Sequence, residues 1–514
     1  MAERERFDVL IVGSGLGGAG VAHVLADSGL RVLILERGDF LNQEKENWDV
    51  EAVAVKRRYD AEEQWIDGEG RPFSPRVYYN VGGSTKVFGA AALRLRREDF
   101  RRRAHEGGTT VGWPFPYEEL EPYYRRAEAL LGVHGNAGED PTEAPRGPFP
   151  HPAIEHEPTI ERLHRRLSRQ GLHPLHLPLA IDQGPNGRCR KGSPCDGFPC
   201  MVRAKGDAEN SLLRPILRAK NPNVTLRTGS YVERLETDES GTRVIAAHAV
   251  CGTARVVIEA GVFVVSAGAV NSAALLLRSA SPHHPNGLAN SSGLVGRCFM
   301  SHNNSVILAL SPLRRNPTVF QKTLAIHDFY NSGSKRGGPL GTIQLRGKIK
   351  AEMLRTKRSL LLRLFASAIA ERSIDLWVMS EDLPDADNRV TVDEQGRIHL
   401  ARRPKNVEAH RQLVERAKSI MRKAGYPICI VDKRGVSAVQ HQCGTARFGN
   451  DPRSSVLDQW CRSHDLPNLY VVDASFFPSS GAVNPSLTLL AQALRAAEHL
   501  KAEITTAAPA RPKA

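Results

Sequence analysis

Near the C-terminus, a histidine in a Gly-rich loop is followed by a strongly marked helix start. The loop carries His441, a buried strand is predicted at 468–473, and a helix is predicted to begin at Asn484-Pro485. Asn favours helix caps, Pro suits the first helical position, and apolar residues then repeat at helical spacing. The helix start favours an electron-rich group, and His441 can accept a proton near neutral pH. Taken alone, the segment is more typical of a capped core helix.

A second pattern, at the N-terminus, predicts a dinucleotide site. A short buried strand at 9–12 runs into Gly13-x-Gly15-x-x-Gly18, then a helix, a strand at 31–35 and the acidic Glu36. Gly13 permits a tight turn, Gly15 lets the backbone approach a pyrophosphate, and Gly18 allows close packing of helix on strand. Glu36 has the separation expected of a ribose ligand. This unit predicts a dinucleotide but does not distinguish NAD from FAD.

The segment 78–92 is a second Gly-rich stretch that could approach a ligand closely, although a surface turn explains it equally well. Together, Gly82-Gly83-Ser84-Thr85, the early glycine motif, His441-x-x-Gly444-Thr445 and Asn484-Pro485 resemble the glucose-methanol-choline (GMC) flavoprotein oxidoreductases. Similar segments include Gly293-x-x-Gly296-Arg-x-x-Met300-x-His302 and Asn388-Arg389-Val390. The overall spacing is most similar to that of bacterial pyranose oxidases and glycoside 3-oxidases.

This resemblance implies FAD as the cofactor. Some family members attach FAD through a histidine of the second Gly-rich loop, but 78–92 holds no His and has Lys86 at roughly that place, so we expect non-covalent FAD. The residues expected to bind it are Gly13, Gly15, Leu16, Gly18, Glu36, Arg37, Gly82, Gly83, Ser84, Val87, Val232, Ala267, Asp473, Ala474, Asn484, Pro485 and Ser486. Asp473 could equally be a turn-capping residue.

The resemblance also implies alcohol oxidation by hydride transfer to flavin N5. His441 is then the base that takes the hydroxyl proton, with a pKa expected near the operating pH, and Asn484 holds the same oxygen. Gln321, Gln344, His441 and Asn484 are the expected substrate ligands. The resemblance favours a secondary hydroxyl of a sugar or glycoside, at C2 or C3, as the group oxidised to a ketone.

Three other hypotheses for the function of the protein stay open. The substrate could be an aliphatic, aromatic or sterol alcohol; the protein could be a non-redox flavoprotein such as a lyase, or a binding protein; or it could use NAD. The presence of both His441 and Asn484 argues against non-redox chemistry. The electron acceptor, oxygen or a quinone-like molecule, and the oligomeric state are not determined by the sequence.

The expected fold class is α/β (α+β overall). A Rossmann-like FAD-binding domain is discontinuous, formed by 1–150, 201–300 and 437–505. A β-sheet-based substrate domain with its lid and connections comprises 151–200 and 301–436, and 506–514 are expected to be a disordered tail. Strand-like alternation is predicted at 306–310, 341–345, 376–379 and 389–392.

Composition excludes several classes of protein. Of the 514 residues, 41% are hydrophobic and 25% charged, as in ordinary globular proteins. The net charge of +14 is spread without aromatic interleaving, so we expect no nucleic acid partner. No apolar run reaches membrane-spanning length and the start lacks signal-peptide order. We therefore expect a cytoplasmic protein without a membrane partner.

Two further segments contain residues that could have other roles. The thiols of Cys189, Cys195 and Cys200 lack CxxC spacing and a nearby fourth ligand, so structural thiols are favoured over a metal site, with a disulfide or redox role left open. The basic run 348–372 surrounds Leu360-Leu361-Leu362. It could form an amphipathic helix touching a membrane, although a solvated helix or an oligomer contact is favoured.

Overall fold

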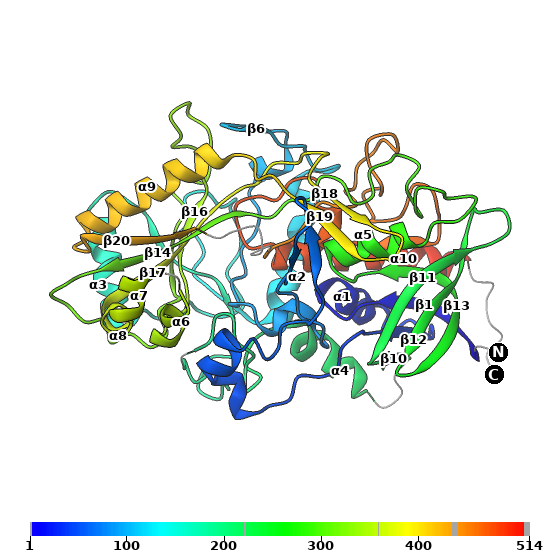
Figure 1. The fold of residues 1–514 in the computed structure, drawn as a ribbon, viewed down its shortest axis with the longest axis horizontal. Helices are drawn as coiled ribbons and strands as arrows, with labels where there is room; N and C mark the ends of the chain where they lie inside the picture. The colour runs from blue at the N-terminus through cyan, green and yellow to red at the C-terminus, as the bar shows by residue number, and fades with distance from the viewer. Residues whose placement is uncertain (1–2, 193, 220–222, 358, 434–439, 508–514) are drawn as a thin grey trace.

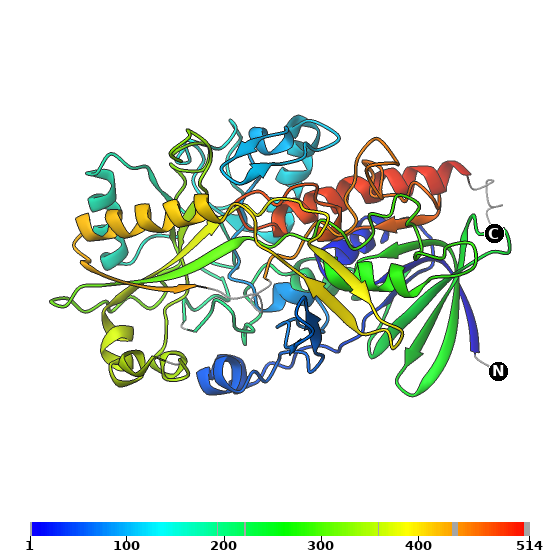
Figure 2. The same ribbon diagram turned by 45° about the horizontal axis from the view of Figure 1, so that its top comes forward.

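Two β-sheets at opposite ends of the molecule organise the chain in the computed structural model, which describes residues 3–192, 194–219, 223–357, 359–433 and 440–507 (Figure 1). A seven-stranded, largely parallel sheet lies at one end and a six-stranded antiparallel sheet at the other. Turning the molecule shows helix α9 (Val407–Lys423) lying along the six-stranded sheet (Figure 2). The mixed α/β fold confirms the predicted class.

The seven-stranded sheet has the order β10-β2-β1-β13-β12-β11, with β21 also paired to β13. Strands β10, β2, β1, β13 and β21 run parallel, whereas β11 and β12 add an antiparallel edge. The apolar run at 9–12 is buried on both faces, as is usual for a parallel strand. The strand bounds are β1 Glu3–Val12, β2 Val32–Leu35, β10 Val224–Arg227, β11 Ser230–Thr237, β12 Val244–Cys251, β13 Ala254–Val265 and β21 Leu469–Val471.

Helices α1 (Leu16–Leu25), α10 (Ser486–Ala507) and α2 (Tyr117–Leu131) pack together beside this sheet. A Cβ on Gly20 would lie 3.0 Å from Leu490 and 3.1 Å from Ala493, so the small residue lets α1 approach α10 closely. Helix α10 continues through Ala507, so the tail predicted from 506 does not begin there, and 508–514 lie outside the described residues.

The six-stranded sheet has the order β20-β14-β17-β16-β15-β8. In β14 (Asn303–Leu310), Ile307 and Ala309 pack toward α9 and α3 (Pro158–Ser168), whereas Val306 and Leu308 pack toward α6–α8. This alternation follows the two-residue period of a strand. The other bounds are β8 Pro174–His176, β15 Leu324–Ile326, β16 Thr342–Leu345, β17 Ser373–Ser380, β20 Ile428–Lys433, α6 Ala351–Arg355, α7 Leu360–Leu364 and α8 Ala366–Arg372.

The remaining elements connect the two sheets. Strands β18 (Arg389–Val392) and β19 (Ile398–Ala401) join β3 (Trp65–Asp67) and β4 (Pro72–Phe73) in a four-stranded sheet. This sheet therefore joins segments that were predicted to belong to different domains, and the predicted bound at 436–437 lies outside the described residues. The other elements are β5 Ala104–His105, β6 Gly108–Thr109, β7 Val133–His134, β9 Leu179–Ala180, α4 Arg214–Leu217, α5 Ala269–Arg278 and short helical turns at Lys45–Trp48, Glu51–Val55, Gly83–Lys86, Arg97–Phe100, Glu209–Leu213 and Ala474–Phe476.

Three structural findings concern membrane segments, cysteines and metal sites. Among the described helices, none has both the length and the apolar character needed to cross a bilayer. All eight cysteines are free, so Cys189, Cys195 and Cys200 form no disulfide here, and burial raises the pKa of the Cys195 thiol. Within the described residues no cluster of metal-ligating side chains is found.

Candidate active site between the two sheets

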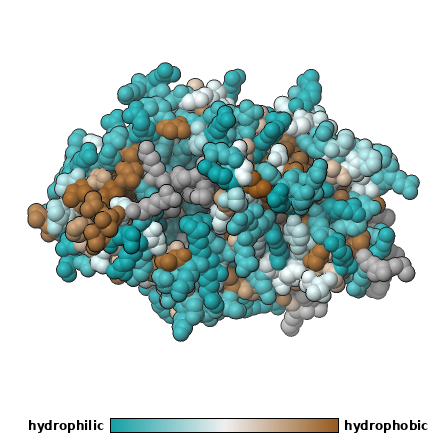
Figure 3. All heavy atoms as spheres, viewed as in Figure 1, coloured by the Kyte–Doolittle hydropathy of each residue, from teal (hydrophilic) through white to brown (hydrophobic). Residues whose placement is uncertain are grey.

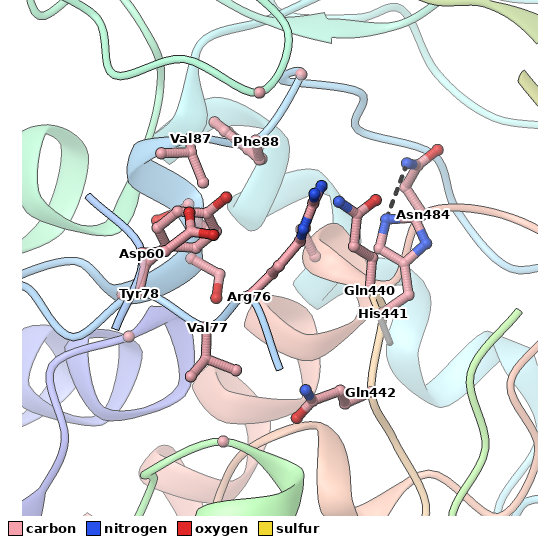
Figure 4. Close-up of a pocket in the computed structure, with 18 of the residues that line it drawn as sticks. Asp60, Arg76, Val77, Tyr78, Val87, Phe88, Gln440, His441, Gln442 and Asn484 are labelled. Atoms are coloured by element: carbon pink, nitrogen blue, oxygen red, sulfur yellow. Dashed lines mark hydrogen bonds between the residues drawn. The ribbon is translucent and has the colours of Figure 1, made fainter. Parts of the chain in front are cut away.

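A cavity of about 620 Å³ extends from the glycine turn after β1 to the six-stranded sheet. Its walls include the end of β2, the second Gly-rich loop, the loop after β13 and the start of α10, together with side chains from β14, β16 and β17. In the close-up, Gln440, His441 and Asn484 lie on one side, with Asp60 and Tyr78 on the other (Figure 4). The cavity thus brings residues of both sheets to one space.

The glycine turn has the geometry of a dinucleotide cradle. Gly13 has φ +100°, and a Cβ there would lie 2.4 Å from the Ser266 carbonyl oxygen. A Cβ on Gly18 would lie 2.1 Å from the Gly13 carbonyl oxygen, so this glycine packs helix on strand and does not line the cavity. A Cβ on Gly15 would meet no atom within 4 Å, which leaves the start of α1 open to a ligand. Free amides at this helix start suit a pyrophosphate.

Glu36 and Arg37 stand at the end of β2 and both line the cavity. The Glu36 carboxylate accepts hydrogen bonds from the backbone N–H groups of Ser14 at 3.0 Å and Gly38 at 2.9 Å, which fix its position beside the glycine turn. The Arg37 guanidinium pairs with Glu63 at 2.8 Å and lies 4.0 Å from the centre of the Tyr79 ring. This is the place that a ribose-binding acid requires.

In the second Gly-rich loop, Gly82 has φ +91°, and a Cβ on Gly83 would lie 3.3 Å from the Gly15 Cα. The two glycine segments therefore meet at the cavity. Lys86, which stands roughly where some family members have a flavin-linked histidine, is buried and does not line the cavity. Its ammonium pairs with Asp207 at 3.1 Å and Glu209 at 2.5 Å, a structural role within the fold.

His441 and Asn484 meet at the far end of the cavity. Asn484 Nδ2 lies 3.5 Å from His441 Nε2, and Asn484 Oδ1 accepts a hydrogen bond from Gln344 Nε2 at 3.1 Å. Gln344 thereby orients the amide so that its N–H side faces His441 and the cavity. The structure thus brings together three of the four expected substrate ligands.

A second histidine, His302, determines the tautomer of His441. His302 Nε2 lies 2.9 Å from the Gly481 carbonyl oxygen and 3.2 Å from that of Ser480, so this nitrogen must carry a proton and donate. In the neutral ring its Nδ1 is then an acceptor, and it lies 2.9 Å from His441 Nδ1. His441 Nδ1 therefore donates to His302. The lone pair of His441 is left on Nε2, which faces Asn484 and the cavity.

The surroundings keep His441 neutral. Burial, with smaller contributions from His302 and Lys322, lowers the pKa of His441 to about 3, well below the value expected near the operating pH. The ring is consequently a proton acceptor throughout the neutral range. The backbone of His441 has φ +60°, a region that costs a non-glycine residue about 1–2 kcal/mol. Such strain at a cavity residue is typical of functional sites.

Helix α10 begins one residue later than expected. The first helical residue is Ser486, and the Pro485 carbonyl accepts from the Leu489 N–H at 2.9 Å, so the ladder starts at Pro485. The Asn484 side chain is used by Gln344 and His441, so it does not cap the helix. Asp473 does cap, accepting from Ser475 N–H at 2.9 Å and Gly268 N–H at 2.9 Å, and burial raises the pKa of its carboxyl. It also lines the cavity.

The structure places most of the predicted site residues around this cavity. Every predicted cofactor residue except Gly18 lines it, as do Gln344, His441 and Asn484. Gln321 does not line it: its buried amide donates to Asp375 at 2.9 Å and accepts from Asn316 at 3.3 Å, so its polar atoms are already used in the core. The structure therefore does not bring Gln321 to the cavity with the other three expected substrate ligands.

Sequence reasoning missed several cavity residues, and it quoted His302 in a motif without giving it a role. Residues from the six-stranded sheet and its neighbouring loops contribute charge and polarity that no local pattern indicates. Missed residues that line the cavity are Arg76, Tyr79, Asp196, Lys322, Arg346, Trp377, Gln440 and Gln442.

A dinucleotide cradle that opens on a neutral, oriented histidine is typical of a cofactor-dependent oxidoreductase. The model of the N-terminal part of GMC oxidoreductases matches residues 7–304, and that of the C-terminal part matches 384–493. The chain belongs to the GMC oxidoreductase family and acts on alcohol groups, with FAD as its cofactor. The open side of Gly15 and the amides of α1 fit this group.

Similar proteins span nearly the whole chain. The 6'''-hydroxyparomomycin C oxidase of Streptomyces lividus is 34% identical over 97% of this chain and 92% of its own. The paromamine 6'-oxidase of Streptomyces fradiae is 33% identical with the same coverage. A 2-methyl-1,2-propanediol dehydrogenase of Mycolicibacterium austroafricanum is 30% identical over 96% of this chain and 95% of its own.

Among solved structures, pyridoxine 4-oxidase from Mesorbium loti has a TM-score of 0.68 and 20% identity, covering 96% of this chain and 99% of its own. Formate oxidase of Aspergillus oryzae RIB40 has a TM-score of 0.67 and 16% identity, covering 98% of this chain and 99% of its own. At these identities the likeness supports the fold alone.

Proposed function

We propose that this protein oxidises a hydroxyl group of a sugar or glycoside to a carbonyl. The observation that carries the proposal is the convergence of the His441 Nε2 lone pair and the Asn484 N–H group on one point of the cavity. Bound FAD supplies the hydride acceptor. Oxygen or a quinone-like molecule is the proposed electron acceptor, and a cytoplasmic location is also part of the proposal.

The chain's own residues handle the proton. The substrate hydroxyl donates to His441 Nε2 while its oxygen accepts from Asn484 Nδ2, which holds the carbinol carbon in one orientation. When the hydroxyl proton moves to Nε2, the imidazolium that results keeps its Nδ1–H bond to His302. Burial disfavours the charged form of His441, and the hydrogen bond that His302 accepts stabilises this form.

A polar wall supports a sugar substrate. Lys322 pairs with Asp196 at 3.0 Å in the cavity, and Gln344 and Gln440 also line it. Although burial of Asp196 opposes ionisation, Lys322 and Arg346 lower the pKa of its carboxyl, so the pair stays charged. Such fixed donors and acceptors suit a ligand with many hydroxyl groups. The resemblance to pyranose oxidases and glycoside 3-oxidases favours C2 or C3, whereas the name of the S. fradiae relative favours a 6' position.

A non-sugar alcohol is the second candidate. Ile349, Met353 and Leu354 form an apolar part of the cavity wall. The relative that is a 2-methyl-1,2-propanediol dehydrogenase supports this candidate.

The substrate class is tested by mixing the holoenzyme anaerobically with sugars, glycosides, an amino sugar, choline and benzyl alcohol in turn. We expect a sugar or glycoside to bleach the flavin absorbance, and analysis of the product then locates the oxidised carbon. Bleaching only by a non-sugar alcohol would support the second candidate function, with the same roles for His441 and Asn484. No bleaching by any alcohol would contradict redox action on this panel.

His302→Leu is expected to lower kcat about tenfold to a hundredfold with KM nearly unchanged, because an unsatisfied buried donor costs about 1–3 kcal/mol. The His441 Nδ1–H would lose its acceptor, so the tautomer would no longer be set. Steady-state kinetics and FAD content measure the effect.

The matched control is His302→Gln. Its carboxamide oxygen can accept from His441 while its NH₂ group donates to the carbonyls of Ser480 and Gly481, so most of kcat should return. Equal losses in both variants, or loss of FAD from either, would show that His302 is only structural.

A further inference from the structure

The outer face of α7 exposes a concentrated apolar patch. Leu360, Leu361, Leu364 and Phe365 are 63%, 67%, 69% and 56% exposed, although they stand within six consecutive residues. Hydrophobic side chains gather at this end of the molecule in the space-filling view (Figure 3). We call these four residues the α7 patch. Single exposed apolar residues are ordinary, whereas a contiguous group marks a surface that binds something.

The segment that carries the α7 patch is rich in basic residues. The run 348–372 contains seven Lys and Arg residues and two Glu residues, hence a formal charge of +5. Arg355 and Arg363 are exposed next to the patch. Two basic residues of the run are paired, Lys357 with Asp432 at 2.7 Å and Arg372 with Glu371 at 3.7 Å. The apolar tip thus lies within a positively charged surface.

The same segment forms part of the cavity wall. The cavity is lined by Met353 and Leu354 of α6, by Leu362 of α7, and by Lys357 in the connection between these helices. Leu361 and Phe365 do not line it, and they project from the other side of α7. Whatever covers the α7 patch therefore lies directly outside the substrate end of the cavity.

The charge around the α7 patch favours an anionic lipid surface over a second copy of the chain. In a two-fold dimer through this surface, the basic run of one copy would face the same run of the other, because an isologous interface pairs a patch with itself. That arrangement would bring two charges of the same sign together. Anionic lipid head groups would complement the basic residues, and leucine and phenylalanine side chains enter the boundary between head groups and acyl chains.

We propose that the α7 patch docks this protein on an anionic membrane surface, with the substrate end of the cavity next to the lipid. This is an interfacial contact made by a short apolar tip and a basic rim, and it departs from the expectation of no membrane partner. It does not depend on which alcohol is the substrate. Docking would give the cavity direct access to a lipid-soluble electron acceptor.

The test is flotation of the holoenzyme with vesicles of phosphatidylcholine alone or mixed with phosphatidylglycerol. We expect binding to the anionic vesicles only, and weaker binding at high salt because exposed charges are screened. The double variant Leu361→Asp, Phe365→Asp should bind about a hundredfold more weakly, since two large apolar side chains no longer enter the lipid. Its turnover of a soluble alcohol should equal that of the wild type.

Ile245→Asp is the matched control, because Ile245 is 44% exposed on β12, in the other sheet. It should bind the anionic vesicles like the wild type. Failure of the wild type to float with anionic vesicles, or equal binding by the double variant, would overturn the proposal. A dimer in light scattering that the double variant converts to monomer, without vesicle binding, would assign the α7 patch to a second copy and also overturn it.

Discussion

Reduction of the bound FAD by substrate is expected to slow about 10²- to 10⁴-fold in His441→Ala, the usual contribution of a general base. FAD should stay bound, because the glycine turn and Glu36 lie at the other end of the cavity. The physical reason is that His302 and Asn484 together orient Nε2 of His441 toward the proposed substrate position. Anaerobic stopped-flow absorbance measures the rate constant.

The pH dependence gives a second readout. Because the pKa of His441 is lowered to about 3, the ring stays neutral as pH falls through the ordinary histidine range, and the rate should fall only when the ring takes up a proton at lower pH. His464→Ala is the control, since His464 contacts Ser455 outside the cavity and should leave the rate unchanged. Unchanged reduction in His441→Ala would remove it as the base.

Gly15→Val is expected to weaken FAD binding about tenfold to a hundredfold, because forcing a bulkier side chain into an occupied space costs about 1–3 kcal/mol and each 1.4 kcal/mol is tenfold. The new side chain would occupy the space at the start of α1 that a pyrophosphate needs. As the cofactor is expected to be non-covalent, the protein should purify without its yellow colour. The ratio of flavin to protein absorbance measures the loss.

This substitution separates an effect on FAD binding from an effect on folding. A Cβ at Gly15 meets no atom within 4 Å, whereas one at Gly13 would lie 2.4 Å from a backbone oxygen and disturb folding itself. Gly15→Val should therefore keep the wild-type circular dichroism. Gly147→Val, at another glycine without neighbours, is the control and should keep FAD. A Gly15→Val protein with full flavin content would contradict the pyrophosphate assignment.

Long-range assembly corrected several element bounds. The apolar run at 262–266 predicts a short buried strand, whereas in the structure it is the end of β13, a continuous strand that starts at Ala254. The sequence predicts a helix at 116–135 with Tyr123, Ala127 and Leu130 on one face. In α2, Ala127 is buried together with Tyr117, Tyr124 and Leu131, whereas Tyr123 and Leu130 are half-buried. The basic run 348–372 forms three short helices. Local helix and strand propensities fix the ends of an element only to within one or two residues.

The sequence by itself determined the local dinucleotide unit, because its strand, tight turn, helix and acid are neighbours in the chain and each residue type has a short-range reason for its place. It also placed His441 and Asn484 on the segments that reach the cavity. Only the tertiary structure decided that His302, 139 residues before His441, sets its tautomer, and that Gln321 is used up in the core. These pairings depend on how distant segments of the chain pack in three dimensions, and no periodicity along the chain records a contact between residues so far apart.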